Sequence, residues 1–185
     1  MPVSEETYQR VALEDPEGRW ELHCGQLRRK PEMTAEHEHI GRRLASFLSR
    51  QLDPDAFEVA VNGGRLRRSS GDYYLPDVCV IPISSVQRFF ADPGTFEVFN
   101  EPMPLVVEVW SPSTGDYDVD SKLPEYRRRG DREVWRIHPY EQTLIIWRRQ
   151  PDGSYVEAIH RHGVVDVTSL PGVSIDLDEL FRLLR

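Results

Sequence analysis

The chain has 185 residues with 39% hydrophobic and 29% charged side chains, and its formal net charge is −8 at pH 7. A chain of this length buries enough apolar surface to fold without disulfides or structural metals, so we expect one domain over residues 1–185. No apolar run reaches the roughly 18 residues of a membrane span, and the acidic N-terminus lacks the features of a secretory signal, which predicts a soluble cytoplasmic protein. The negative charge argues against a constitutive DNA coat protein, because Lys and Arg supply most of the affinity for phosphates.

The positions of the cysteines and arginines bear on whether the chain has a redox site, a zinc site or a basic surface. Cys24 and Cys79 lie far apart without Cys-x-x-Cys spacing, which favours reduced packing residues over a redox or zinc site. Arginines gather in two groups, one at 65, 67 and 68 and one at 127–129. Each group is typical of a solvated face, and a local basic surface is the alternative.

The first half of the chain predicts a hairpin, a helix and strands. Residues 19–30 alternate apolar and polar side chains around Cys24-Gly25, which indicates a short antiparallel hairpin. A helix follows from Thr34, its expected N-cap, with apolar residues at helical spacing until Asp53-Pro54. Residues 57–68 hold two short strand-like pieces about an Asn-Gly-Gly turn, and residues 73–83 indicate a buried strand opened by Pro76-Asp77.

The second half predicts a central strand and further strands between two helices. Residues 84–104 are expected to form a loop with a helical turn at 86–90, and residues 105–110 (LVVEVW) form a central strand. The pattern from Asp118 to Arg129 indicates a helix that is capped by Asp118 or Asp120 and ends at Gly130. Pro124 would delay the start of this helix. Strands are expected at 133–139, 143–150, 154–161 and 164–167, followed by a helix at 176–184. This order predicts a mixed β-sheet flanked by helices, in the α/β to α+β range.

Two acidic residues stand where apolar residues are expected. Glu108 interrupts the apolar run of residues 105–110, and Asp77 opens the strand after Pro76. A buried carboxylate costs several kcal/mol unless it is paired, protonated or bound to a metal. If the two strands bring these carboxylates together, their hard oxygen atoms suit Mg²⁺ or Mn²⁺. The alternative is that each carboxylate lies on a solvated strand edge.

The spacing of these carboxylates resembles a nuclease motif. Pro76-Asp77, followed by Glu108-Val109-Trp110, resembles the PD-(D/E)XK nuclease superfamily. More narrowly, the segments AEHEHI (35–40), LPDVCV (75–80) and LVVEVWSPST (105–114), with Asp118, Lys122, Leu123, Tyr126, Gly130, Glu133, Trp135 and Pro139, resemble the Uma-type family of putative restriction endonucleases. The resemblance covers most of the chain and implies a restriction-endonuclease-like fold. Pro124 within the helix and His138, where the family usually has an acidic residue, depart from its pattern.

The resemblance also implies roles for individual residues. Trp110 occupies the usual lysine position of the motif, and Lys122 from the following helix fits the replacement. Asp77, Glu108 and the carbonyl of Val109 would hold the divalent ion, and Lys122 would orient or deprotonate the attacking water. His37 matches the histidine that opens the family's first helix, with a secondary role at the metal. Glu36 is the alternative acid, and His37 is equally well explained as a boundary residue above the core.

The function expected from this reasoning is Mg²⁺-dependent hydrolysis of DNA phosphodiester bonds, in a homodimer by analogy with the fold. The rival is a nuclease-like scaffold with weak or lost catalysis that binds nucleic acid or protein, which the acidic net charge favours. The sequence has no Gly-rich phosphate-binding loop, nucleophile-elbow serine or HExxH helix, so nucleotide hydrolase, esterase and zinc protease functions have no support.

Overall fold

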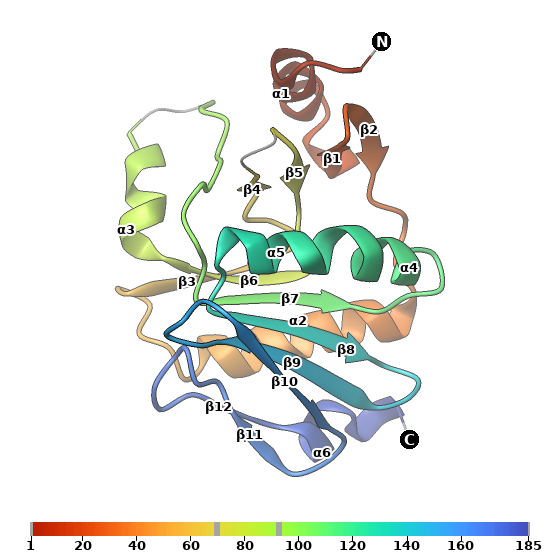
Figure 1. The fold of residues 1–185 in the computed structure, drawn as a ribbon, viewed down its shortest axis with the longest axis vertical. Helices are drawn as coiled ribbons and strands as arrows, with labels where there is room; N and C mark the ends of the chain where they lie inside the picture. Colours follow the sequence, from red (N-terminus) through yellow and green to blue (C-terminus); the bar gives the residue numbers. More distant parts are fainter. Residues whose placement is uncertain (1, 69–70, 92–93, 185) are drawn as a thin grey trace.

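The computed structural model describes residues 2–68, 71–91 and 94–184, and its centre is a six-stranded sheet (Figure 1). The strand order is β10-β9-β8-β7-β6-β3, in which β7 and β8 are parallel and the other neighbours antiparallel. The strands are β3 (Phe57–Val61), β6 (Val78–Pro82), β7 (Leu105–Val109), β8 (Glu133–His138), β9 (Thr143–Arg149) and β10 (Tyr155–His160). The mixed sheet predicted from the sequence is therefore confirmed, with the 105–110 strand in its interior.

A second sheet is built from short strands near the N-terminus. Its order is β2-β1-β5-β4, with β1 (Trp20–His23), β2 (Gln26–Arg29), β4 (Leu66–Arg67) and β5 (Tyr73–Tyr74). The predicted hairpin at 19–30 is confirmed, and its turn places Cys24 and Gly25 at φ 50° and 72°. The predicted strand at 73–83 divides into β5 and β6, because residues 75–77 carry the chain from the second sheet into the first.

Helices cover both faces of the six-stranded sheet. On one face, α2 (Ala35–Ser49) buries Ile40, Leu44 and Leu48 together with α6 (Leu177–Leu180) and the β11–β12 hairpin (Val164–Asp166 and Ser174–Asp176). Thr34 caps α2 as expected, since its hydroxyl accepts a hydrogen bond from the backbone N–H of His37. The opposite face packs against α5 (Leu123–Arg129) and α3 (Ile83–Val86). No helix in the described ranges is long and apolar enough to cross a membrane.

Three helical expectations need correction. The helix expected from Asp118 begins earlier, with α4 (Gly115–Tyr117) and a π turn at Asp118–Lys122 leading into α5, so Asp118 and Asp120 are not N-caps. Pro124 is tolerated because it lies in the first turn of α5, where the wide turn already interrupts the regular hydrogen bonds. The C-terminal helix is shorter than predicted, because Asp176 is its N-cap and the chain continues after Leu180 as a separate 3-10 turn at Arg182–Leu184.

The N-terminal helix α1 (Glu5–Glu14) is absent from the sequence prediction. Ser4 caps it, and Tyr8 and Ala12 pack with the second sheet in a small separate core. With only these two buried residues, its apolar periodicity is too weak to stand out. Its position over the second sheet depends on tertiary contacts.

Several side chains also differ from expectation. Cys79 is buried, but Cys24 is exposed, so packing explains only one of the two free cysteines. Phe90 is 68% exposed at the end of the expected helical turn. Each arginine group contains ion pairs, such as Arg67 with Glu5 and Arg129 with buried Asp131, while Arg128 lies on the solvated surface as expected.

Candidate active site

Strand β7 brings Glu108 into the interior beside Asp77. All five residues of β7 are buried, and Glu108 is 1% exposed. Val78 of β6 pairs with Val107 of β7, so the same antiparallel register places Asp77 opposite Glu108. Opposite residues in such a pair point to the same face with Cβ atoms about 4.5–5.5 Å apart. Sheet register thus brings together two carboxylates that lie 31 positions apart in the sequence.

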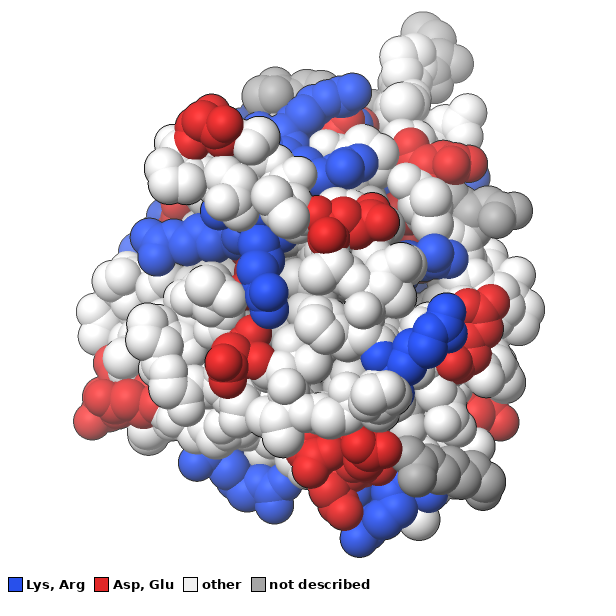
Figure 2. Space-filling model, turned by 60° about the horizontal axis from the view of Figure 1, so that its bottom comes forward, with Lys and Arg blue, Asp and Glu red and all other residues white. Residues whose placement is uncertain are grey.

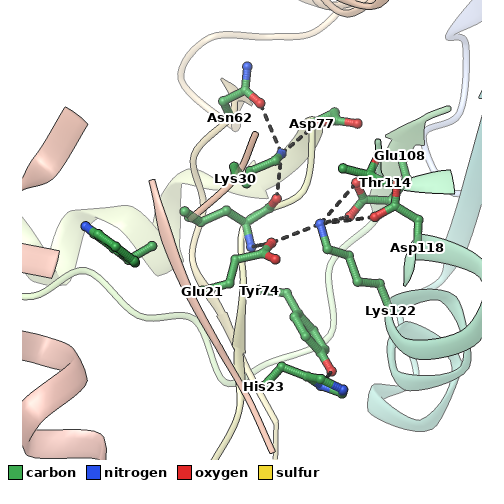
Figure 3. Close-up of polar contacts among 12 residues, drawn as sticks. Glu21, His23, Lys30, Asn62, Tyr74, Asp77, Glu108, Thr114, Asp118 and Lys122 are labelled. Atoms are coloured by element: carbon green, nitrogen blue, oxygen red, sulfur yellow. Dashed lines mark hydrogen bonds and ion pairs between the residues drawn. The ribbon is translucent and has the colours of Figure 1, made fainter. Parts of the chain in front are cut away.

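Three hydrogen-bond donors hold Asp77, and Figure 3 shows one of them, Lys30. The Lys30 ammonium lies 2.6 Å from Oδ1, while Nε2 of His37 and the backbone N–H of Val109 lie 2.9 and 2.7 Å from Oδ2. Burial alone would raise the pKa of Asp77, but the charge of Lys30 and the hydrogen bond from His37 lower it well below its usual range. Asp77 is therefore an ionised carboxylate in a fixed orientation.

Glu108 lies in a second group of polar contacts around Lys122. Lys122 is 2% exposed, and its Nζ lies 2.9 Å from Glu21, 3.3 Å from Glu108 and 3.4 Å from Asp118. The hydroxyl of Tyr126 donates to Oε1 of Glu108 at 2.5 Å. The sequence prediction that Lys122 returns to the Glu108 strand is matched by this geometry.

The excess of carboxylates over ammonium groups around Lys122 determines which of these side chains carry a proton. Burial would lower the pKa of Lys122, but Glu108 and its neighbouring carboxylates raise it, so the amine is charged. One ammonium cannot balance three carboxylates. Burial, with the nearby charges of Asp118 and Asp77, therefore raises the pKa of Glu108 well above its usual value despite Lys122. The same burial raises the pKa of Asp118.

These residues line a cavity of about 320 Å³ that is open to solvent on one side. Its walls include four residues predicted from the sequence, namely His37, Asp77, Glu108 and Lys122. Arg28 and Arg29 of β2 are exposed at its rim. Glu36, the alternative acid, does not line the cavity and accepts a hydrogen bond from Tyr140. His37 of α2 is thus the residue that faces Asp77.

The sequence did not single out several residues of this site. Glu21 of β1 contacts Lys122 at the end of the π turn, and Lys30, directly after β2, contacts Asp77. The alternation of residues 19–30 places Glu21 on the polar face of its hairpin, and only the structure shows that this side chain is buried. Asp118 was treated as a helix cap and Tyr126 only as a family position. Their contacts depend on the earlier start of the helix.

A family model confirms the resemblance found in the sequence. The model for Uma2, described as putative restriction endonuclease, matches residues 5–178. This chain belongs to the Uma2 family.

A solved structure shares the Uma2 protein's fold. It is the crystal structure of a putative nuclease belonging to DUF820 from Anabaena variabilis ATCC 29413. It matches with a TM-score of 0.80 and 19% sequence identity over 100% of both chains. Among curated proteins, none matches this sequence. The fold of the Uma2 protein is therefore that of a nuclease-like protein.

The cavity of the Uma2 protein has the donors for a hard divalent cation. If all were ionised, two negative charges would be left over after the two ammonium groups, Lys30 and Lys122, balance the four carboxylates, Glu21, Asp77, Glu108 and Asp118. Oδ1 of Asp118 accepts no hydrogen bond. A divalent ion would remove this excess, and carboxylate oxygens suit Mg²⁺ or Mn²⁺. Within the described ranges, no donors from three residues of this cavity lie within 4.8 Å of one another. Backbone oxygen and water would therefore complete the coordination, as is usual for Mg²⁺.

Trp110 takes no part in the cavity lining of the Uma2 protein. Its ring stacks on His138 with centroids 4.2 Å apart, and Tyr140 meets it edge-on at 5.8 Å. The two departures from the usual motif, Trp110 and His138, are therefore in contact with each other. Lys122 supplies the ammonium near Glu108 that the motif position itself lacks.

Proposed function

We propose that this protein is a divalent-metal-dependent endonuclease that hydrolyses DNA phosphodiester bonds, with Mg²⁺ or Mn²⁺ as cofactor. The observation that carries the proposal is the placement of Asp77 and Glu108 side by side in one cavity with Lys122. Family membership and the nuclease-like fold support the nuclease class. The choice of DNA and of the metal rests on site chemistry and on analogy with the family.

Asp77 and Glu108 would hold the ion, with the carbonyl of Val109 as a further ligand. A divalent ion bound there supplies Lewis-acid activation of water and of the phosphate. His37 and the N–H of Val109 orient the Asp77 carboxylate, and Tyr126 orients Glu108, while the ion would compete with Lys30 for Oδ1 of Asp77. Fixed ligands favour a defined ion position.

Lys122 would place positive charge where the phosphate gains negative charge. Its raised pKa keeps it protonated, so orientation of water and charge stabilisation fit it better than proton abstraction. Arg28 and Arg29 at the rim would neutralise flanking phosphates. On the face shown in Figure 2, acidic and basic side chains are interspersed, which agrees with weak, local contact to DNA.

Nicking of supercoiled plasmid tests this proposal. Wild-type protein with Mg²⁺ or Mn²⁺ should nick the plasmid, and Glu108→Gln should lower the rate by at least about a hundredfold. Glu58→Gln on exposed β3 makes the same chemical change away from the cavity and should retain the wild-type rate. Thermal melts should show that Mn²⁺ stabilises wild type but not Glu108→Gln.

The interaction-module alternative makes the opposite prediction. It expects no cleavage of DNA by wild type with either ion, while binding of nucleic acid or protein persists. The acidic net charge and the internal pairing of the arginines favour this alternative. The homodimer implied by analogy also stays a prediction, and sedimentation equilibrium of the full chain would test it.

A further inference from the structure

A second group of possible metal ligands lies at the tip of the β1–β2 hairpin. Within the parts of the chain that the structure describes, His23, Cys24 and Asp72 are the one group of three His, Cys, Asp or Glu residues whose ligand atoms all lie within 4.8 Å of one another. His23 and Cys24 come from the hairpin, and Asp72 directly precedes β5. His23 lies beside the Tyr74 hydroxyl, apart from the carboxylates around Lys122 (Figure 3). None of the three residues lines the catalytic cavity.

The distances suit a single tetrahedral ion. Nδ1 of His23 lies 3.9 Å from Sγ of Cys24 and 3.7 Å from Oδ2 of Asp72. In tetrahedral zinc sites, bonds of about 2.0–2.3 Å to nitrogen, oxygen and sulfur separate the ligand atoms by roughly 3.4–3.7 Å. All three ligand atoms lie within 4.8 Å of one another, so side-chain adjustments would bring them onto one ion. His23 and Cys24 are accessible to solvent, so an ion can enter and a fourth position stays open to water.

The backbone and neighbouring side chains hold this arrangement in place. Cys24 has a left-handed φ of 50°, which is unfavourable for a residue other than Gly, Asn or Asp. Its backbone N–H donates to Oδ1 of Asp72 at 2.9 Å, which ties the turn to β5. Arg68 donates to Oδ2 of Asp72 at 2.8 Å, a contact typical of residues that orient a carboxylate ligand. The hairpin tip thus presents a thiol and an imidazole toward a fixed carboxylate.

We propose that His23, Cys24 and Asp72 form a zinc site distinct from the catalytic cavity. A set of thiolate, imidazole and carboxylate suits Zn²⁺ and does not suit Mg²⁺, whereas the all-oxygen cavity prefers hard cations. On binding, Cys24 loses its thiol proton to solvent and forms the Zn–S bond. Nδ1 of His23 exchanges its hydrogen bond with Tyr74 for the metal, while Arg68, 3.3 Å from the Tyr74 hydroxyl, remains its donor.

The site would fasten the second sheet over the cavity. Glu21 and His23 lie two positions apart on β1 and therefore on the same face of the strand. Glu21 contacts Lys122, whereas His23 lies in the hairpin tip. Zinc between this tip and Asp72 would restrict the motion of β1 and so hold Glu21 against Lys122. The ion would have a structural role beside the chemistry of the cavity.

Cobalt substitution of the full, reduced chain tests the proposal. Co²⁺ should produce a thiolate-to-cobalt charge-transfer band that saturates at one equivalent, and Zn²⁺ should abolish it by displacement. Cys24→Ser should lose the band, and His23→Ala should weaken binding at least about tenfold. Cys79→Ala is the matched control, because Cys79 is the other free cysteine and is buried away from the hairpin.

A variant in the catalytic cavity tests whether the cobalt band could arise from an ion bound there. Asp77→Asn should retain the cobalt band, which distinguishes this site from zinc bound at Asp77 and His37. A wild-type protein without the band, a band that persists in Cys24→Ser, or a band lost in Asp77→Asn would each overturn the proposal. Cys24→Gly, which fits the left-handed turn without strain, gives a folded thiol-free variant if Cys24→Ser is unstable.

Discussion

Replacing Lys122 with methionine tests whether the buried ammonium holds the carboxylate group together. Methionine keeps most of the side-chain length but removes the charge that lies 2.9–3.4 Å from Glu21, Glu108 and Asp118. Breaking a buried ion pair by removing one partner costs about 3–5 kcal/mol of unfolding free energy. We expect a loss of this size at neutral pH, measured by urea denaturation. Arg161→Met, which removes an exposed cation, should change stability by less than about 0.5 kcal/mol.

The pH dependence of this loss follows from the raised pKa of Glu108. A carboxyl group whose folded pKa lies above its ordinary 4.5 keeps its proton in the folded state while the unfolded chain loses it. Stability therefore falls as pH rises from the unfolded to the folded pKa of Glu108. Removal of Lys122 raises the folded pKa of Glu108 further. The difference between wild type and Lys122→Met should be larger at about pH 8 than at about pH 5.

A double-mutant cycle assigns the effect to a particular pair. Lys122→Met combined with Glu108→Gln should cost less than the sum of the single substitutions, with a coupling of about 1–3 kcal/mol. Additive effects, or a Lys122→Met loss that does not change with pH, would refute the buried ion-pair reasoning. The same variants give a cleavage test, because Lys122→Met should reduce nicking at least about a hundredfold while retaining Mn²⁺ binding in calorimetry.

Three further predictions concern the surroundings of the cavity. Lys30→Met should tighten Mn²⁺ binding about tenfold in calorimetry, because it removes a cation 2.6 Å from Asp77, and unchanged affinity would show that the two cations do not compete. Gly115→Ala should lower the unfolding free energy by about 1–3 kcal/mol in urea melts, because the added Cβ would overlap the Trp110 indole, and a wild-type midpoint would contradict this contact. The His138 pKa should lie below 6.5 in an NMR titration, because burial and, to a smaller extent, the charge of Arg136 outweigh the opposing effect of Glu141. Since the unfolded chain then binds more protons, His138 should make stability decrease as pH falls from 6.5, and a titration at or above 6.5 would contradict the assignment.

Sequence alone was sufficient for elements whose patterns are strong and local. The cap at Thr34 and the apolar spacing after it specify α2, and the apolar side chains around Glu108 specify the buried strand β7. The cost of burying Glu108 and Asp77 was also evident from residue type, which is why both were selected before their positions were known. Helix α1 and strand β12 were missed because little in their own residues distinguishes them from a loop.

Tertiary structure decided which charges meet. Sheet register, which depends on pairing between distant strands, places Asp77 opposite Glu108, and the second sheet adds Glu21 and Lys30 to the same cavity. The pKa directions of Glu108 and Lys122 follow from this arrangement and have no local sequence signal. Burial excludes water, so these charged groups interact mainly with one another. Residue type therefore determined which ionisable groups were available, and folding determined which of them are in contact.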